Sequence, residues 1–70
     1  MTLDQQKKYY VDQKVFFKEY SGRVSALWES KDTEPSFGVK VKCKFKDKVN
    51  GGIADKVYLV TDERFLKVVA

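Results

Sequence analysis

The chain has 70 residues, of which 43% are hydrophobic and 34% charged, and its formal net charge is +4. A chain of this length forms one small domain and buries only about 60% of the surface that it exposes when unfolded. It contains no histidine and a single cysteine, Cys43. These absences exclude a histidine proton shuttle, an internal disulfide and a thiolate zinc site.

The opening segment predicts where the protein resides. The stretch MTLDQQKKYY lacks the apolar run of a secretory signal, and no segment approaches the roughly 20 apolar residues of a membrane helix. A lone cysteine fits a compartment in which disulfides do not form. We therefore expect a cytoplasmic protein without membrane contact. Residues 1–9 are expected to be loose or to form a short helical turn ahead of one domain over residues 10–70.

Strand patterns follow this segment. Residues 10–17 are rich in aromatic and β-branched side chains, which favours a first strand, and YSG at 20–22 is expected to form the turn after it. The next run, GRVSALWES, is expected to be a second strand with Val24, Ala26 and Trp28 on one face. This shared face predicts that Trp28 belongs to the core.

The clearest alternation lies in the middle of the chain. The polar stretch SKDTEPS is expected to be a loop, and a third strand then runs from residue 37 to residue 46. NGG at 50–52 accepts positive φ and predicts a hairpin onto a fourth strand, ADKVYLVT. TDERF is expected to form one helical turn capped by Thr61 or Asp62, and FLKVVA to form a short fifth strand.

No catalytic or metal-binding pattern emerges from the sequence. Cys43 lies in an apolar alternation rather than beside a base, which favours core packing over a nucleophilic role. The acidic pairs Asp62 with Glu63 and Asp32 with Glu34 are adjacent or loop-borne, a context in which carboxylates are usually solvated. The glycines fit no phosphate-binding loop of the GxxxxGK[ST] kind. The sequence therefore predicts a non-enzymatic protein without metal or cofactor.

The expected elements define an all-β fold. Five short antiparallel strands best bury one apolar face and protect their edges in a small, partly open barrel; a two-layer sheet with one helix is the competing architecture. The order YYVDQKVFF, SGRVSALWE, FGVKVKCKF and KVYLVTDERFLKVV resembles Src-homology-3-like small barrels of the KOW and Tudor-like kind, which include short phage and bacterial accessory proteins. The resemblance covers residues 10–69. It implies a binding module for RNA, DNA or peptide segments, acting in the host cytoplasm where the source is viral.

A row of lysines concentrates the positive charge of the chain. GVKVKCKFKDK, residues 38–48, has five lysines and one aspartate and so carries +4, while the other residues balance nine basic against nine acidic side chains. The lysines are Lys40, Lys42, Lys44, Lys46 and Lys48. Alternate strand residues stand roughly 6.6 to 6.8 Å apart, close to the spacing of phosphates along a nucleic-acid strand. The row predicts contact with a nucleic-acid backbone, although exposed lysines also protect strand edges and keep small barrels soluble.

A second basic cluster lies in KVFFK. Strand alternation places Phe16 on the face opposite Val15 and Phe17, between Lys14 and Lys18. There it would stack a base while the two lysines hold phosphates. The alternative is that Phe16 packs beneath the N-terminal segment or is rotated inward by a bulge. Barrel topology decides whether this cluster adjoins the lysine row.

Tyrosines give a third candidate surface. Tyr9, Tyr10 and Tyr20 lie near turns or at the start of the chain and are expected at the surface, where protein interfaces favour tyrosine. Tudor-like barrels often gather such rings into cages for methylated cations, and the three tyrosines are therefore candidates for contact with a protein partner.

Two functions remain open from the sequence. The first is a small barrel that binds nucleic acid mostly through phosphates, with little sequence selectivity. The second is a protein-interaction module, such as a viral or accessory inhibitor that docks on an acidic host protein by edge-strand pairing and tyrosine contacts. A monomer and a homodimer formed through an uncovered barrel edge are both compatible with the pattern.

Overall fold

The computed structural model describes residues 1–31, 34–46, 49 and 51–69. Its elements are α1 (Leu3–Gln6), β1 (Lys14–Phe17), β2 (Tyr20–Ser30), β3 (Ser36–Lys46), β4 (Ile53–Val60), the 3-10 turn η1 (Glu63–Phe65) and β5 (Leu66–Val68). The five strands form one antiparallel sheet in the order β4-β3-β2-β1-β5. Since β4 and β5 end this order, the sheet is a partly open barrel, which confirms the all-β fold with a helical turn before the last strand.

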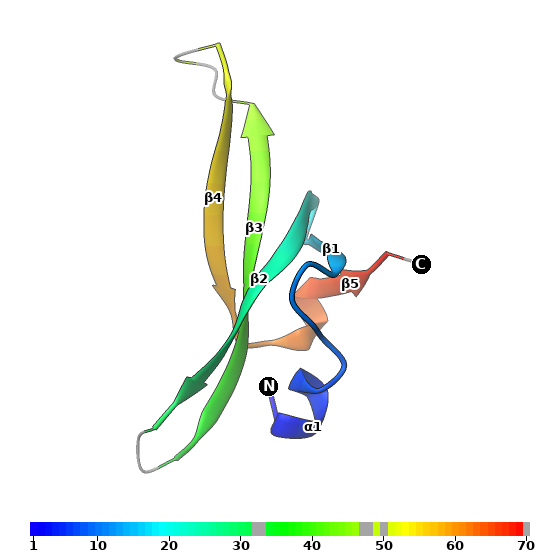
Figure 1. Cartoon of the computed structure of the whole chain (residues 1–70), viewed down its shortest axis with the longest axis vertical. Coiled ribbons are helices and arrows are strands. Elements are labelled where there is room, and N and C mark those ends of the chain that lie inside the picture. Colours follow the sequence, from blue (N-terminus) through cyan, green and yellow to red (C-terminus); the bar gives the residue numbers. More distant parts are fainter. Residues whose placement is uncertain (32–33, 47–48, 50, 70) are drawn as a thin grey trace.

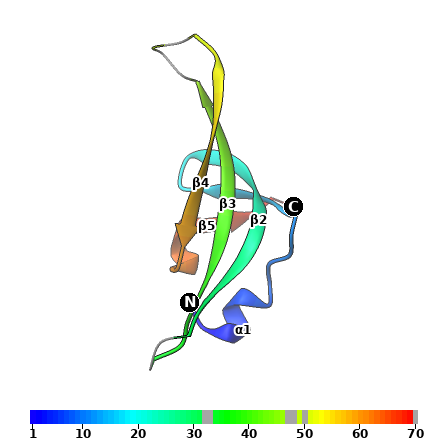
Figure 2. The same ribbon diagram turned by 60° about the vertical axis from the view of Figure 1, so that its left-hand side comes forward.

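The long strands carry the overall shape (Figure 1). β2, β3 and β4 run along the longest axis of the molecule, and the β3–β4 hairpin extends past the other strands at one end. β1, β5 and α1 all lie on one side of these long strands in Figure 1, and β5 runs at a steep angle to them in the turned view (Figure 2). This side is the inner face of the sheet, and the opposite side is called the outer face below.

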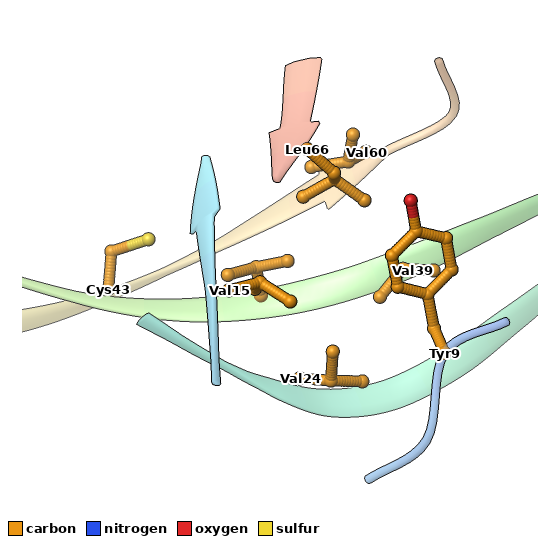
Figure 3. Packing of buried hydrophobic residues seen from close by; sticks show 8 residues of the cluster. Tyr9, Val15, Val24, Val39, Cys43, Val60 and Leu66 are labelled. Carbon is orange, nitrogen blue, oxygen red and sulfur yellow. The ribbon is translucent and has the colours of Figure 1, made fainter. Parts of the chain in front are cut away.

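The core fills the inner face with small aliphatic side chains (Figure 3). Val15 from β1 lies beside Val24 and Val39 of the long strands. These three residues and Val41 have no solvent exposure. The cluster also contains Tyr9, Cys43, Val60 and Leu66. The expected core position of Cys43 is therefore confirmed, and burial raises the pKa of its thiol.

The N-terminal segment forms a short helical turn, which is one of its two expected alternatives. Thr2 and Gln5 make a reciprocal capping box at the start of α1. The Gln6 side chain donates hydrogen bonds from Nε2 to the carbonyl oxygens of Trp28 at 2.8 Å and Gly38 at 2.9 Å. Tyr9 follows and is buried in the core, so this segment packs against the sheet.

The first strand is shorter than expected, and its turn lies elsewhere. Residues 10–13 form a turn in which Asp12 has a φ of 72° and Gln13 Oε1 accepts the Tyr10 amide proton at 3.2 Å. The chain reverses at Lys18, whose φ is 53°, and residues 20–22 already belong to β2. The turn predicted at YSG is therefore wrong.

A register shift divides the second strand. Val24 pairs with Val41 on the inner face, but Ala26 pairs with Lys40 on the outer face, because the ladder shifts between Val24 and Ala26. Ser25 occupies this bulge, and its hydroxyl donates to the Lys40 carbonyl at 3.2 Å. The prediction that Trp28 shares the face of Val24 is therefore wrong, and Trp28 is half-buried outside the core cluster.

The second half of the chain follows the sequence pattern closely. β3 pairs with β4 as the predicted hairpin, and Gly51 in the connection has a φ of 69°. Asn50 of the predicted turn lies outside the described residues. Asp62 caps η1 by accepting the Arg64 amide proton at 3.0 Å, and the Arg64 guanidinium lowers the pKa of the Asp62 carboxyl.

Candidate nucleic-acid interface

The described lysines of β3 share one exposed face. Side chains alternate along this strand, so that Val39, Val41 and Cys43 are buried while the intervening lysines are exposed. These lysines are Lys40, Lys42, Lys44 and Lys46, and they project from the outer face of the sheet. Lys48, the fifth lysine of the predicted row, lies outside the described residues.

Cross-strand pairing joins this row to the basic residue of β1. Lys14 pairs with Arg23 across β1 and β2, and Arg23 pairs with Lys42 across β2 and β3. Residues paired in this way lie on the same face, and neighbouring strands are about 4.8 Å apart. Lys14 and Arg23 therefore extend the lysine row sideways over three strands. The name basic face is used below for Lys14, Arg23, Lys40, Lys42, Lys44 and Lys46.

An open hollow of about 440 Å³ lies within the basic face. Its lining residues come from four strands: Lys14, Ser21, Gly22, Arg23, Lys42, Lys44 and Asp55. The Arg23 guanidinium donates from Nη1 to the Asp12 carbonyl oxygen at 2.9 Å, which fixes the head group at the side of the hollow. Its remaining N–H groups are donors of the kind that phosphates accept.

One carboxylate interrupts the positive charge. Asp55 pairs with Lys44 in the β3–β4 ladder, and its Oδ2 lies 3.8 Å from Lys42 Nζ. Both side chains are about half exposed, so water screens this ion pair and it holds the two groups weakly. Six basic residues and one acidic residue leave the basic face and Asp55 together with a net charge of +5.

Phe16 lies on the outer face beside the hollow. It pairs with Ser21, a lining residue, and with Lys67 of β5, and its exposed fraction is 38%. The β1–β2 ladder is regular over this residue, so the alternative of an inward rotation by a bulge is wrong. Of the two alternatives that the sequence left open for Phe16, the structure shows the outward one.

Lys18 does not join Phe16. Its ammonium lies 5.4 Å from the centre of the Phe17 ring and 5.5 Å from that of Phe65. Lys18 has a positive φ and lies in the β1–β2 turn, beyond the end of β1. The strand alternation that predicted Lys18 beside Phe16 therefore does not reach it. Of the predicted KVFFK cluster, the structure therefore brings Lys14 and Phe16, but not Lys18, next to the lysine row.

The three tyrosines predicted at the surface separate in the structure. Tyr9 is buried in the core, where burial and the charge of Glu63 raise the pKa of its hydroxyl, so its predicted surface position is wrong. Tyr10 is exposed. Tyr20 stacks on Tyr58 at 6.4 Å, and the adjacent charge of Glu19 raises the pKa of Tyr20.

Tyr58 is the centre of the aromatic contacts. Its ring also packs on Phe17 at 5.0 Å and carries the Lys56 ammonium 5.3 Å from its centre. A lysine of the chain itself thus lies over this ring, the position that a bound cation would take in an aromatic cage.

Arg23 is the functional candidate that the sequence did not reveal. It lies next to Val24 in an ordinary strand alternation, and nothing local to β2 distinguishes it from a solvated residue. Only the register of β2 against both β1 and β3 places it between Lys14 and Lys42. No cluster of three or more potential metal ligands occurs among the residues that the structure describes.

Comparisons with protein-family models, curated proteins and solved structures give no match for this chain. In the described part of the chain, no helix has the length and apolar character needed to cross a bilayer. The geometry of the basic face is therefore the main guide to function.

Proposed function

We propose that the protein binds nucleic acid through the basic face and catalyses no reaction. The observation that carries this proposal is the convergence of six basic side chains from three strands on one exposed face, with a hollow among them. Phosphates would release counterions on binding to these groups, which is the main source of affinity for a polyanion. Contacts to phosphates carry no sequence information, so selectivity among sequences is expected to be low.

The fold supports the same proposal. The order β5-β1-β2-β3-β4, with a 3-10 turn before the closing strand, fits the Src-homology-3-like small barrels of the KOW and Tudor-like kind that the motif order resembles. We infer that the chain is a binding module of this class. The single buried cysteine supports a reducing compartment, and we place the protein in the cytoplasm.

Salt dependence tests the proposal directly. For five engaged phosphates, the logarithm of the association constant should fall with the logarithm of salt concentration at a slope of about −3.5 for a single strand and about −4.5 for a duplex. Fluorescence anisotropy of a labelled oligonucleotide at several salt concentrations measures this slope. A slope near zero, or no binding at low salt, contradicts the proposal.

Matched lysine variants assign the effect to the basic face. The double variant Lys42→Ala/Lys44→Ala should make the slope shallower by about 1.4 to 1.8, because two phosphate contacts are lost. The control Lys7→Ala/Lys56→Ala removes the same charge from the C-cap of α1 and from the inner face of β4. It should leave the slope unchanged, and an equal effect of the two variants counts against a defined face.

A protein-interaction module is the second candidate. β4 ends the sheet and pairs only with β3 among the described strands, so one side of its backbone is available for strand addition. Tyr10 and Tyr20 are exposed and offer the side-chain type that interfaces favour. Retention of a defined acidic protein from nuclease-treated lysate, together with a failure to bind oligonucleotides at low salt, would favour this candidate.

A further inference from the structure

An apolar stripe, interrupted by Asp55 opposite Lys44, runs beside the lysine row on the outer face. In the β3–β4 ladder, Lys40 pairs with Leu59, Lys42 with Val57 and Lys46 with Ile53. The three aliphatic side chains are 47%, 52% and 75% exposed in that order. Because neighbouring strands are about 4.8 Å apart, each of these lysines has an exposed apolar side chain immediately beside it.

Such a stripe is unfavourable for a solvated surface. Ile53, Val57 and Leu59 lie on β4, the edge strand, where exposed apolar side chains invite association with other chains. Among the residues that the structure describes, the largest fully buried side chains are those of Val15, Val24, Val39, Val41 and Cys43, so none is larger than valine. The largest aliphatic residues of β4, Ile53 and Leu59, thus lie outside this small core and beside Lys46 and Lys40.

The lysine row and the apolar stripe together fit a ligand that carries negative charge along one side and apolar groups along the other. A single-stranded nucleic acid has this character, because its phosphates follow one track and its unpaired bases present flat apolar faces beside it. In a duplex the base faces are stacked inside, so a surface that touches the phosphates finds no apolar partner for Ile53, Val57 and Leu59. The spacing of roughly 6.7 Å between successive lysines of the row is close to the spacing of successive phosphates along one strand.

We propose that the outer face of the β3–β4 hairpin binds a single strand, with phosphates along Lys40, Lys42 and Lys44 and bases against Val57 and Leu59. This inference rests on the proposed function and specifies its ligand. Phe16, on the opposite side of the lysine row, offers a second stacking surface where the strand crosses the hollow. Preference for a single strand over a duplex is the direct consequence.

The experiment compares a labelled thymidine oligomer of about 15 nucleotides with a duplex of the same length. Val57→Trp adds an aromatic surface at a half-exposed strand position and should raise affinity for the thymidine oligomer at least about fivefold, without change for the duplex. Val57→Thr keeps the branched shape, removes apolar contact and should lower affinity for the oligomer about twofold.

Val68 provides the matched control. It is 52% exposed, as Val57 is, but lies on β5 and pairs with the inner-face residue Val15. Val68→Trp and Val68→Thr should leave both affinities unchanged. Circular dichroism of each variant shows that the strand content is retained.

The outcomes separate this inference from the proposed function. Equal binding of both oligonucleotides, with a normal salt slope and no response to Val57 variants, overturns the single-strand inference and leaves the basic face intact. Failure of every oligonucleotide to bind at low salt overturns both. A Val57 response that appears with phosphatidylserine vesicles but not with the thymidine oligomer assigns the stripe to a membrane surface and also overturns the inference.

Discussion

At the scale of single residues, Gly22 is a position of β2 where the neighbouring strand β3 leaves no room for a side chain. A Cβ atom at this position would lie 2.6 Å from the Lys42 carbonyl oxygen and 2.9 Å from Cys43 Sγ. Gly22→Ala therefore forces the two strands apart and should lower the free energy of unfolding by about 1 to 3 kcal/mol. Urea denaturation followed by tryptophan fluorescence measures this change.

Gly52 offers the control for this substitution. Nothing lies within 4 Å of a Cβ atom added to Gly52, so Gly52→Ala should change stability by less than about 0.5 kcal/mol. Equal denaturation midpoints for the two alanine variants would contradict the close approach of the strands. From the sequence Gly22 could be interpreted only as a turn residue, because the atoms that exclude a side chain there lie about twenty residues further along the chain.

At the scale of elements, α1 is too short to be stable alone, since isolated helices of fewer than about 12 residues are marginal in water. The Gln6 side chain compensates by donating to the carbonyls of Trp28 and Gly38. Gln6→Leu keeps the approximate size of the side chain but leaves both carbonyls without this donor. The free energy of unfolding should fall by about 1 to 3 kcal/mol, as measured by urea denaturation.

A substitution at the neighbouring Lys7 tests whether the loss of the Gln6 hydrogen-bond donor causes the loss of stability. Lys7→Gln changes an exposed side chain of the same segment and should shift stability by less than about 0.5 kcal/mol. A Gln6→Leu variant as stable as the unsubstituted protein would show that other contacts of the segment, such as those of Met1 and Tyr9, hold α1 in place.

Elements differ in how far the sequence predicts them. β3 could be predicted almost to the residue, because strict alternation of apolar and basic side chains is a local signal. The bulge at Ser25 could not, since it is defined only by the pairing of β2 with β3. One inserted residue moves Ala26 and Trp28 to the outer face, and the predicted core position of Trp28 failed for this reason.

At the scale of the whole molecule, the candidate site combines a local signal with a topological one. The lysine row is visible in the sequence, whereas its junction with Lys14 needs the registers of two strand pairs and the intervening Arg23. The same registers place the aliphatic side chains of β4 beside the lysines. The sequence thus shows where the positive charge is concentrated, but only the pairing registers of the strands show which residues lie beside the lysines.

Asp55 gives the sharpest prediction for the charge of the whole molecule. It is the one carboxylate that lines the hollow among the described residues, and it lies 3.8 Å from Lys42. Asp55→Asn raises the combined charge of the basic face and position 55 from +5 to +6 and releases Lys42 to meet a phosphate. Affinity for an oligonucleotide should rise about two- to fivefold at low salt, and the salt slope should steepen by about 0.7 to 0.9.

Glu29→Gln separates this local effect from net charge. It makes the same change in total charge at an exposed residue of β2 that lies beyond the bulge and pairs with Phe37, away from the hollow. Screening confines the influence of an exposed charge to about 10 Å at ordinary ionic strength, so Glu29→Gln should leave the salt slope unchanged. Equal gains from the two variants in anisotropy titrations would mean that the protein attracts nucleic acid by its net charge, and that no particular face receives it.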